Sequence, residues 1–167
     1  MERSKLAEIA EREAKLNLVW AVGGPARKYT KDFEPVFGQG RFAWCGAFVR
    51  WCCKEAGLNI PINAPSGFGY TFALVEAWQQ WAIQQKFYID HDGKFAPTAG
   101  DIVIFDWDQK SIDQPDLNWD SHVAVFLRRN GELYQTAEGN SGNMTAVRNQ
   151  KSRFIQGYIR IPAEFKF

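Results

Sequence analysis

This chain has few cysteines and few histidines, and neither positive nor negative charge predominates. Its 167 residues include three cysteines and two histidines, and the net charge is +1. An odd number of cysteines, two of them adjacent, argues against a disulfide framework and predicts free thiols in a reducing compartment. No cysteine or histidine spacing matches a zinc site. The near-neutral charge gives no reason to expect nucleic acid or an anionic membrane as a partner.

Long apolar runs are also missing. The chain opens on Met1-Glu2-Arg3 and a charged amphipathic segment, which lacks the apolar core of a signal peptide, and no stretch is long enough for a transmembrane helix. We therefore expect a monomer that is made in the cytoplasm without a signal peptide and does not insert into membranes. Neither repeats nor low-complexity linkers divide the chain, which predicts a single domain over residues 1–167.

The most informative stretch, residues 42–57, carries one apolar stripe at helical spacing. Gly57 can adopt the left-handed conformation that ends many helices, and Pro61 blocks any continuation. The stretch is therefore predicted to form one helix. Its stripe consists of Cys45, Phe48, Val49, Cys52 and Ala56.

Cys45 falls in the first turn of this predicted helix. The positive end of the helix dipole lowers the pKa of a first-turn thiol and favours the thiolate. No Ser, Thr, Asp or Asn precedes the helix to cap it, so its first N–H groups are available to an oxyanion. Gln39, six residues ahead of Cys45, could turn its amide toward the thiol, or it could be an exposed loop residue. The alternative for Cys45 is a buried small hydrophobe.

The order of the other predicted elements indicates an α+β fold, with helices first and an antiparallel sheet after them. Helical spacing is found in two further segments, and alternation with turn residues between the runs predicts strands from residue 100 onward. The further helices are expected at 4–17 and 70–85, and strands at 87–89, 101–105, 122–127, 133–137 and 157–161.

His122 opens one predicted strand, and the Asn130-Gly131 pair predicts a hairpin that returns the next strand beside it. Glu138 and Asn140, where that strand ends, are therefore expected near His122. A cysteine nucleophile needs a base within reach, and the base needs a third group to orient its ring. Taken singly, His122 could be a buried strand histidine, and Glu138 and Asn140 could be turn residues.

Four blocks of this chain together resemble the CHAP domains, the cysteine, histidine-dependent amidohydrolases/peptidases related to the NlpC/P60 group of the papain-like superfamily. The resemblance spans about residues 4–161. It implies a papain-like fold, with helices packed on a C-terminal antiparallel sheet, and catalysis by Cys45, His122, Glu138 and Asn140. The blocks are Trp44-Cys45-Gly46-Ala47-Phe48-Val49, Gly100-Asp101-Ile102-Val103-Ile104-Phe105, Ser121-His122-Val123-Ala124-Val125 and Glu138-Gly139-Asn140.

What the resemblance implies is a peptidoglycan hydrolase. Cys45 would attack an amide of the peptide stem, its cross-bridge or the bond to the glycan, and His122 would act as general base, without a cofactor. An endolysin of a phage or prophage, or a secreted antibacterial effector with an immunity protein as partner, fits such an enzyme. The alternatives are a cytoplasmic amidase for a small γ-glutamyl or polyamine conjugate, and a catalytically dead wall-binding module.

The stretch 106–120 is longer than the usual link between the corresponding strands of CHAP domains. It is rich in carboxylates, which hard cations prefer, so Asp106, Asp108 and Asp120 are candidate calcium ligands. The spacing and glycine of an EF-hand are absent, and the alternative is a solvated acidic loop.

Overall fold

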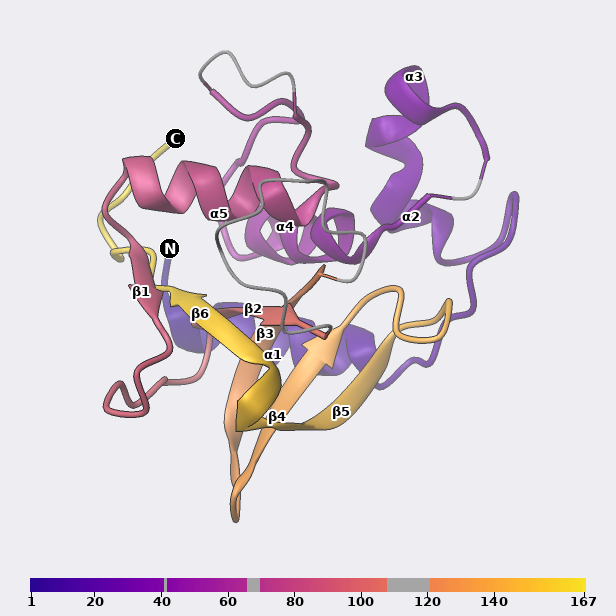
Figure 1. Cartoon of the computed structure of the whole chain (residues 1–167). Helices are drawn as coiled ribbons and strands as arrows, with labels where there is room; N and C mark the ends of the chain where they lie inside the picture. The colour runs from indigo at the N-terminus through magenta and orange to yellow at the C-terminus, as the bar shows by residue number, and fades with distance from the viewer. Residues whose placement is uncertain (41, 66–69, 108–120) are drawn as a thin grey trace.

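A layer of helices covers one face of an antiparallel sheet in the computed structural model, which describes residues 1–40, 42–65, 70–107 and 121–167 (Figure 1). The helices are α1 (Arg3–Ala14), α2 (Arg27–Thr30), α3 (Glu34–Phe37), α4 (Cys45–Glu55) and α5 (Val75–Gln84), with 3-10 turns η1 (Lys31–Phe33) and η2 (Ser152–Phe154). The strands are β1 (Tyr88–Asp90), β2 (Ile102–Asp106), β3 (Ser121–Asn130), β4 (Leu133–Glu138), β5 (Ala146–Lys151) and β6 (Ile155–Ile159). The predicted α+β class is confirmed.

The sheet has the strand order β1-β6-β2-β3-β4-β5, and each neighbouring pair is antiparallel. The predicted hairpin is present: Asn130 pairs with Leu133, and Gly131 has a φ of 61°, a conformation that glycine adopts without steric cost. Because β2 lies on the other side of β3, His122 has Phe105 as its direct cross-strand partner. The strand β3, which carries His122, is therefore central in the sheet.

The strand β5 corrects the sequence analysis, which predicted no strand between those at 133–137 and 157–161. This segment pairs with β4 along six residues, from Glu138 opposite Ala146 to Leu133 opposite Lys151. It is an edge strand with mostly exposed or half-exposed side chains. Strands are predicted from the alternation of apolar and polar residues, which arises when one face of the strand is buried. An edge strand that buries few of its side chains does not need this alternation.

Helix α4 ends as predicted, in a Schellman motif. Gly57 has a φ of 94°, its N–H donates to the carbonyl of Lys54 at 3.0 Å, and the N–H of Leu58 donates to the carbonyl of Cys53 at 2.9 Å. Leu58 is buried and supplies the hydrophobic contact of this motif. The helix begins three residues later than the predicted boundary, at Cys45.

The boundaries of α1 differ from the prediction at both ends. Ser4 lies inside the first turn and does not cap the helix, because the N-cap position is taken by Glu2. The helix stops at Ala14, and Leu16 is 50% exposed because the chain no longer follows the helical period there. The apolar side of the predicted helix was expected to carry Leu6, Ile9, Ala10 and Leu16, and of these only the first three are buried.

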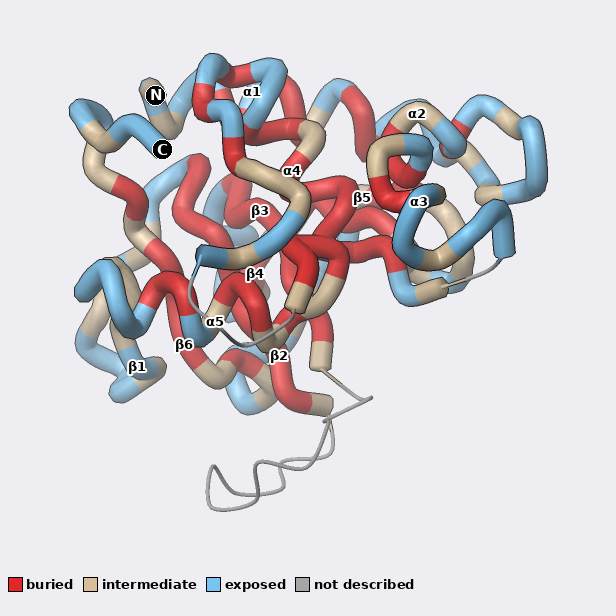
Figure 2. Tube along the Cα trace, turned by 90° about the horizontal axis from the view of Figure 1, so that it is seen from above, coloured by how far each residue is buried: buried red, intermediate tan, exposed pale blue. Residues whose placement is uncertain are grey.

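Both faces of the sheet are covered, as expected when adjacent strand residues point to opposite sides. Ile102, Ile104, Val123 and Val125 face the helices and join the main core, through which the buried backbone of α4 and β3 runs (Figure 2). The opposite face carries a smaller aromatic cluster, in which Phe95, Trp107 and Phe154 pack on buried residues. Those buried residues are Val103, Phe105, Ala124, Phe126, Tyr134, Ile155 and Tyr158.

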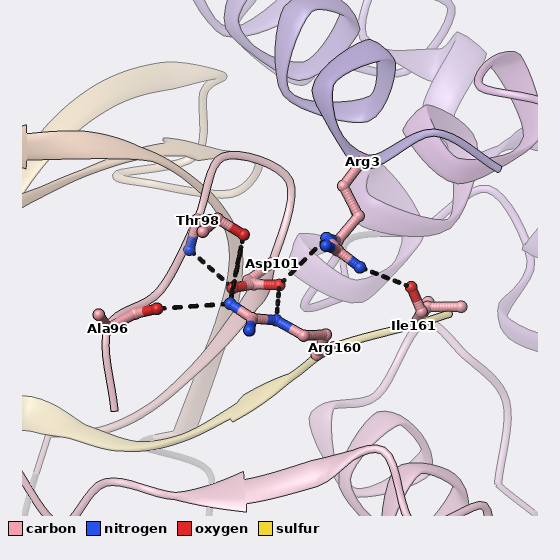
Figure 3. Close-up of polar contacts among 6 residues, drawn as sticks. All are labelled: Arg3, Ala96, Thr98, Asp101, Arg160 and Ile161. Carbon is pink, nitrogen blue, oxygen red and sulfur yellow. Dashed lines mark hydrogen bonds and ion pairs between the residues drawn. The ribbon is translucent and has the colours of Figure 1, made fainter. Parts of the chain in front are cut away.

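The Gly100-Asp101 block ties three elements together (Figure 3). Fully buried Asp101 accepts bonds from Arg160 Nε at 3.0 Å and Nη2 at 2.5 Å, and Arg3 Nε lies 3.7 Å away. A Cβ on Gly100 would lie 1.9 Å from the carbonyl oxygen of Arg3, so only glycine allows α1 to approach this closely. These contacts hold the start of β2 against α1 and against the segment that follows β6.

In the parts of the chain that the structure describes, no helix has both the length and the apolar character needed to cross a membrane.

Candidate active site

Cys45 is the first residue of α4, where the chain changes from an irregular segment to helix. Its N-cap residue, Trp44, makes no capping hydrogen bond with its side chain. The first bond of the helix runs from the N–H of Phe48 to the carbonyl of Trp44, so the N–H groups of Cys45, Gly46 and Ala47 lie outside the helical ladder. The thiol is 3% exposed and sits where backbone N–H groups and the positive helix end coincide.

Two glycines allow other parts of the chain to approach this helix start. A Cβ on Gly46 would lie 2.5 Å from the carbonyl oxygen of Ala73, and one on Gly139 would lie 2.3 Å from Cβ of Phe48. Contacts this short exclude a side chain at either position unless the backbone moves. Gly139 directly follows Glu138, so its missing side chain brings the end of β4 against the helix that begins at Cys45.

His122 and Glu138 meet at the adjacent ends of β3 and β4. Nε2 of His122 lies 3.1 Å from Oε2 of Glu138, and both side chains are buried. The ring of His122 also interacts with the Cys45 side chain. Because Nε2 is engaged by the carboxylate, Nδ1 is the ring nitrogen left for the thiol. The structure thus brings Cys45, His122 and Glu138, from three separate elements, into one chain of contacts.

The second carboxylate oxygen of Glu138 is held by two residues that the sequence analysis missed. Oγ1 of Thr136 and Nε2 of Gln150 each donate to Oε1 at 2.7 Å. Thr136 shares a strand face with Glu138 because the two are two residues apart, a signal present in the sequence. Gln150 lies on β5, which the sequence analysis did not predict. The carboxylate is therefore fixed on both oxygens.

The charges in this group reinforce one another. Burial acts to lower the pKa of His122, but hydrogen bonds and charge interactions with Cys45 and Glu138 outweigh it and raise the pKa to about 10. Burial acts to raise the pKa of Glu138, but the bond to His122 and its charge, with the bonds from Gln150 and Thr136, lower it to about 2. At neutral pH the site therefore contains an imidazolium facing a carboxylate.

Asn140 and Gln39 are not part of this contact chain. Asn140 lies in the turn after β4 with a φ of 58°, a left-handed conformation that asparagine tolerates better than most residues. Gln39 is exposed and lies beside a small cavity, of about 10 Å³, that Trp20, Arg27 and Phe42 also line. Within the described part of the chain, no hydrogen bond joins either side chain to Cys45 or His122, so their catalytic roles stay predictions.

The calcium hypothesis rests mainly on residues outside the described ranges, since Asp108 and Asp120 are among those not described. Asp106 is the last residue of β2 and is largely buried. Among the residues that the structure describes, no three His, Cys, Asp or Glu side chains are grouped closely enough to hold a metal ion. Calcium binding stays a prediction.

Comparison with known proteins identifies the family of the chain. The family model of the CHAP domain matches residues 37–140, which is more than half of the chain and includes the segments that carry Cys45, His122 and Glu138. The fold and this match place the protein in the class of cysteine, histidine-dependent amidohydrolases, and the chain belongs to the CHAP domain family. No curated protein and no solved structure matched the chain.

Proposed function

We propose that this protein is a cysteine peptidoglycan hydrolase that cleaves an amide bond of the peptide stem, of its cross-bridge or between stem and glycan. The observation that carries the proposal is the contact chain of Cys45, His122 and Glu138 at the start of α4. A cysteine sulfur bonded to a buried imidazole, which is itself bonded to a carboxylate, is the arrangement of a nucleophile with its acid–base partner. Membership of the CHAP family supports wall amides as the substrate class.

The reaction assigns one role to each group. The Cys45 thiolate attacks the amide carbon, and the oxyanion that forms accepts bonds from N–H groups at the start of α4. His122 gives its proton to the leaving amine, which departs and leaves a thioester on Cys45. His122 then takes a proton from water, which attacks the thioester and releases the acid. Glu138 keeps the ring oriented and stabilises the imidazolium throughout.

The direct test uses purified protein and isolated peptidoglycan under reducing conditions, so that the three thiols stay free. We expect soluble muropeptides by mass spectrometry, with new termini that identify the bond cut. The Cys45→Ala variant should release none, because the nucleophile is gone. Folded protein with a reactive Cys45 that releases nothing from walls of several chemotypes would instead favour an amidase for small γ-glutamyl or polyamine conjugates.

The cellular role that we propose is lysis of bacteria, as a phage or prophage endolysin or as a secreted antibacterial effector. Fused to an export signal in a Gram-negative host, the protein should lyse the cells, and the Cys45→Ala fusion should not. The mutant controls for export stress, and it also separates an enzyme from a wall-binding module without activity. Neighbouring lysis genes would favour the endolysin, whereas a gene for an immunity protein would favour the effector.

A further inference from the structure

The ring of His122 lies beside two aromatic rings, in addition to its bonds at the nitrogens. Its centroid lies 6.0 Å from that of Trp107, with 34° between the planes, and 6.3 Å from that of Phe105, with 35° between the planes. Phe105 and Trp107 are themselves stacked at 5.0 Å and nearly parallel, with 4° between their planes. The two rings therefore form one aromatic wall against the imidazole.

The position of this wall follows from the sheet. Phe105 pairs directly with His122 across β2 and β3, and Trp107, two residues further along the chain, follows on the same side. The far side of Trp107 contacts Phe154 of η2, at 5.4 Å and 65°. Phe105 is fully buried, whereas Trp107 is half-buried, so the indole is the part of the wall that solvent reaches.

The imidazole needs such support because of what holds it otherwise. Its hydrogen-bond partners are Cys45 from α4 and Glu138 from β4, and both bond to the ring nitrogens. Bonds at the two nitrogens leave the ring free to rotate about the line that joins these atoms, and aromatic rings packed beside the imidazole restrict this rotation. The face of an aromatic ring also attracts a cation at about 6 Å, and a histidine carries its charge only when protonated.

We propose that Trp107, with Phe105 behind it, is a positioning residue for His122: its indole holds the imidazole in line with Cys45 and Glu138 and stabilises the protonated ring. The inference rests on the proposed function, in which His122 is the acid and base. Trp107 itself takes part in no bond-making step. Its loss should weaken the imidazolium without removing any group that reacts.

The test can be read from the protein alone, because the chain has only two histidines. Carbon-13 labelling of the histidine Cε1 atoms gives two NMR resonances, which a His91→Gln variant assigns. His91 contacts Tyr134 and Tyr158 and serves as the internal reference. In Trp107→Leu we expect the titration midpoint of His122 to fall by about half a unit to one unit, with His91 unmoved. Trp107→Phe should give a smaller fall.

Two further samples keep the proposal open to refutation. Trp51→Leu removes another half-buried indole, one that contacts Tyr29 and not His122, and should leave both midpoints in place. Protein made with 5-fluorotryptophan keeps the shape of every indole but weakens its attraction for cations, and should also lower the His122 midpoint. Unchanged His122 midpoints in folded Trp107→Leu and in the fluorinated protein would overturn the proposal, as would an equal fall in Trp51→Leu.

Activity provides the last readout. If the protein is a peptidoglycan hydrolase, the alkaline limb of its pH profile of kcat/KM should move to lower pH in Trp107→Leu. The shift should equal the fall of the NMR titration midpoint of His122. If the wild type cuts no peptidoglycan, the proposed substrate fails while the NMR result still decides the role of Trp107. If the wild type cuts walls and the limb does not move with the midpoint, Trp107 does not act on the reaction through His122.

Discussion

Nε2 of His122 lies 3.1 Å from Oε2 of Glu138, in a position where both side chains are almost fully removed from water. The pairing links two strand ends that are 16 residues apart in the chain. Because burial opposes a charge on either group, each stays charged only through the other and its further bonds. His122 and Glu138 therefore act as a pair, and substituting either residue changes the pKa of the other.

Replacing Glu138 with Gln should lower kcat/KM by about 10- to 100-fold, since the imidazolium loses the carboxylate that stabilises it. The same change should lower the pKa of His122 from its raised value of about 10, which moves the alkaline limb of the pH–rate profile downward. A pH series of muropeptide release measures both effects. Thr136→Val, which removes one bond to Oε1 but leaves the carboxylate, should cost less. Equal losses of kcat/KM in Glu138→Gln and Thr136→Val, with superimposable pH–rate profiles, would contradict a special role of the carboxylate.

Cys45 should be the most reactive thiol. Cys52 and Cys53 are fully buried, and burial raises the pKa of Cys52 well above its usual range and that of Cys53 to about 12. Substoichiometric iodoacetamide at pH 7, followed by peptide mapping, should label Cys45 first. Labelling of Cys53 with activity retained would reject Cys45 as the nucleophile. The same digest of the Cys45→Ala variant controls for nonspecific alkylation.

The stability of the protein should depend on pH through the same pair. The pKa of His122 is raised on folding, so its stabilisation is complete below about pH 6.5 and is lost as the pH rises through about 10. The pKa of Glu138 is lowered, so its stabilisation is present above about pH 4.5 and is lost as the pH falls through about 2. Urea midpoints should therefore decline between pH 7 and 10, and His122→Gln should flatten that decline. An equally steep decline in His122→Gln would assign it to other groups.

Gly139→Ala should destabilise the fold by about 1 to 3 kcal/mol, because the new methyl group meets Phe48 at 2.3 Å and must displace the helix or the turn. Movement of the turn would also shift Glu138 away from His122, so activity should fall in the fraction that is still folded. Thermal unfolding and muropeptide release measure the two effects. Gly40→Ala is the matched control, since among the described residues its new methyl group would meet only the Phe37 carbonyl oxygen, at 4.0 Å. Similar losses in both variants would contradict the packing argument.

Asp101→Asn should lower the free energy of unfolding by about 3 kcal/mol, since it leaves Arg160 without a buried countercharge. Arg27→Gln, which breaks the exposed pair with Glu34, should have a much smaller effect. Asp101 precedes β2, whereas Phe105, the cross-strand partner of His122, lies near the other end of that strand, so the alkylation rate of Cys45 per folded molecule should stay unchanged in Asp101→Asn. Urea titrations measure the stabilities. A changed alkylation rate would show that Asp101 influences the site.

The elements of this fold that local rules govern could be predicted from the sequence. The C-terminus of α4 needed only a glycine and the leucine after it, and the β3–β4 hairpin needed only Asn130-Gly131. Hairpin geometry then brought Glu138 back to the strand end at His122. Each of these depends on backbone conformations within a few residues, which the side-chain sequence specifies directly.

Tertiary structure alone decided the rest. That Cys45 contacts His122, 77 positions later, depends on how α4 packs on the sheet, and that packing depends on the missing side chains of Gly46 and Gly139. The edge strand β5, with the Gln150 that holds Glu138, has no alternation that predicts it. The aromatic wall beside His122 depends on strand register. A sequence lists these side chains, but the close approach that makes them a site is a property of the packed core.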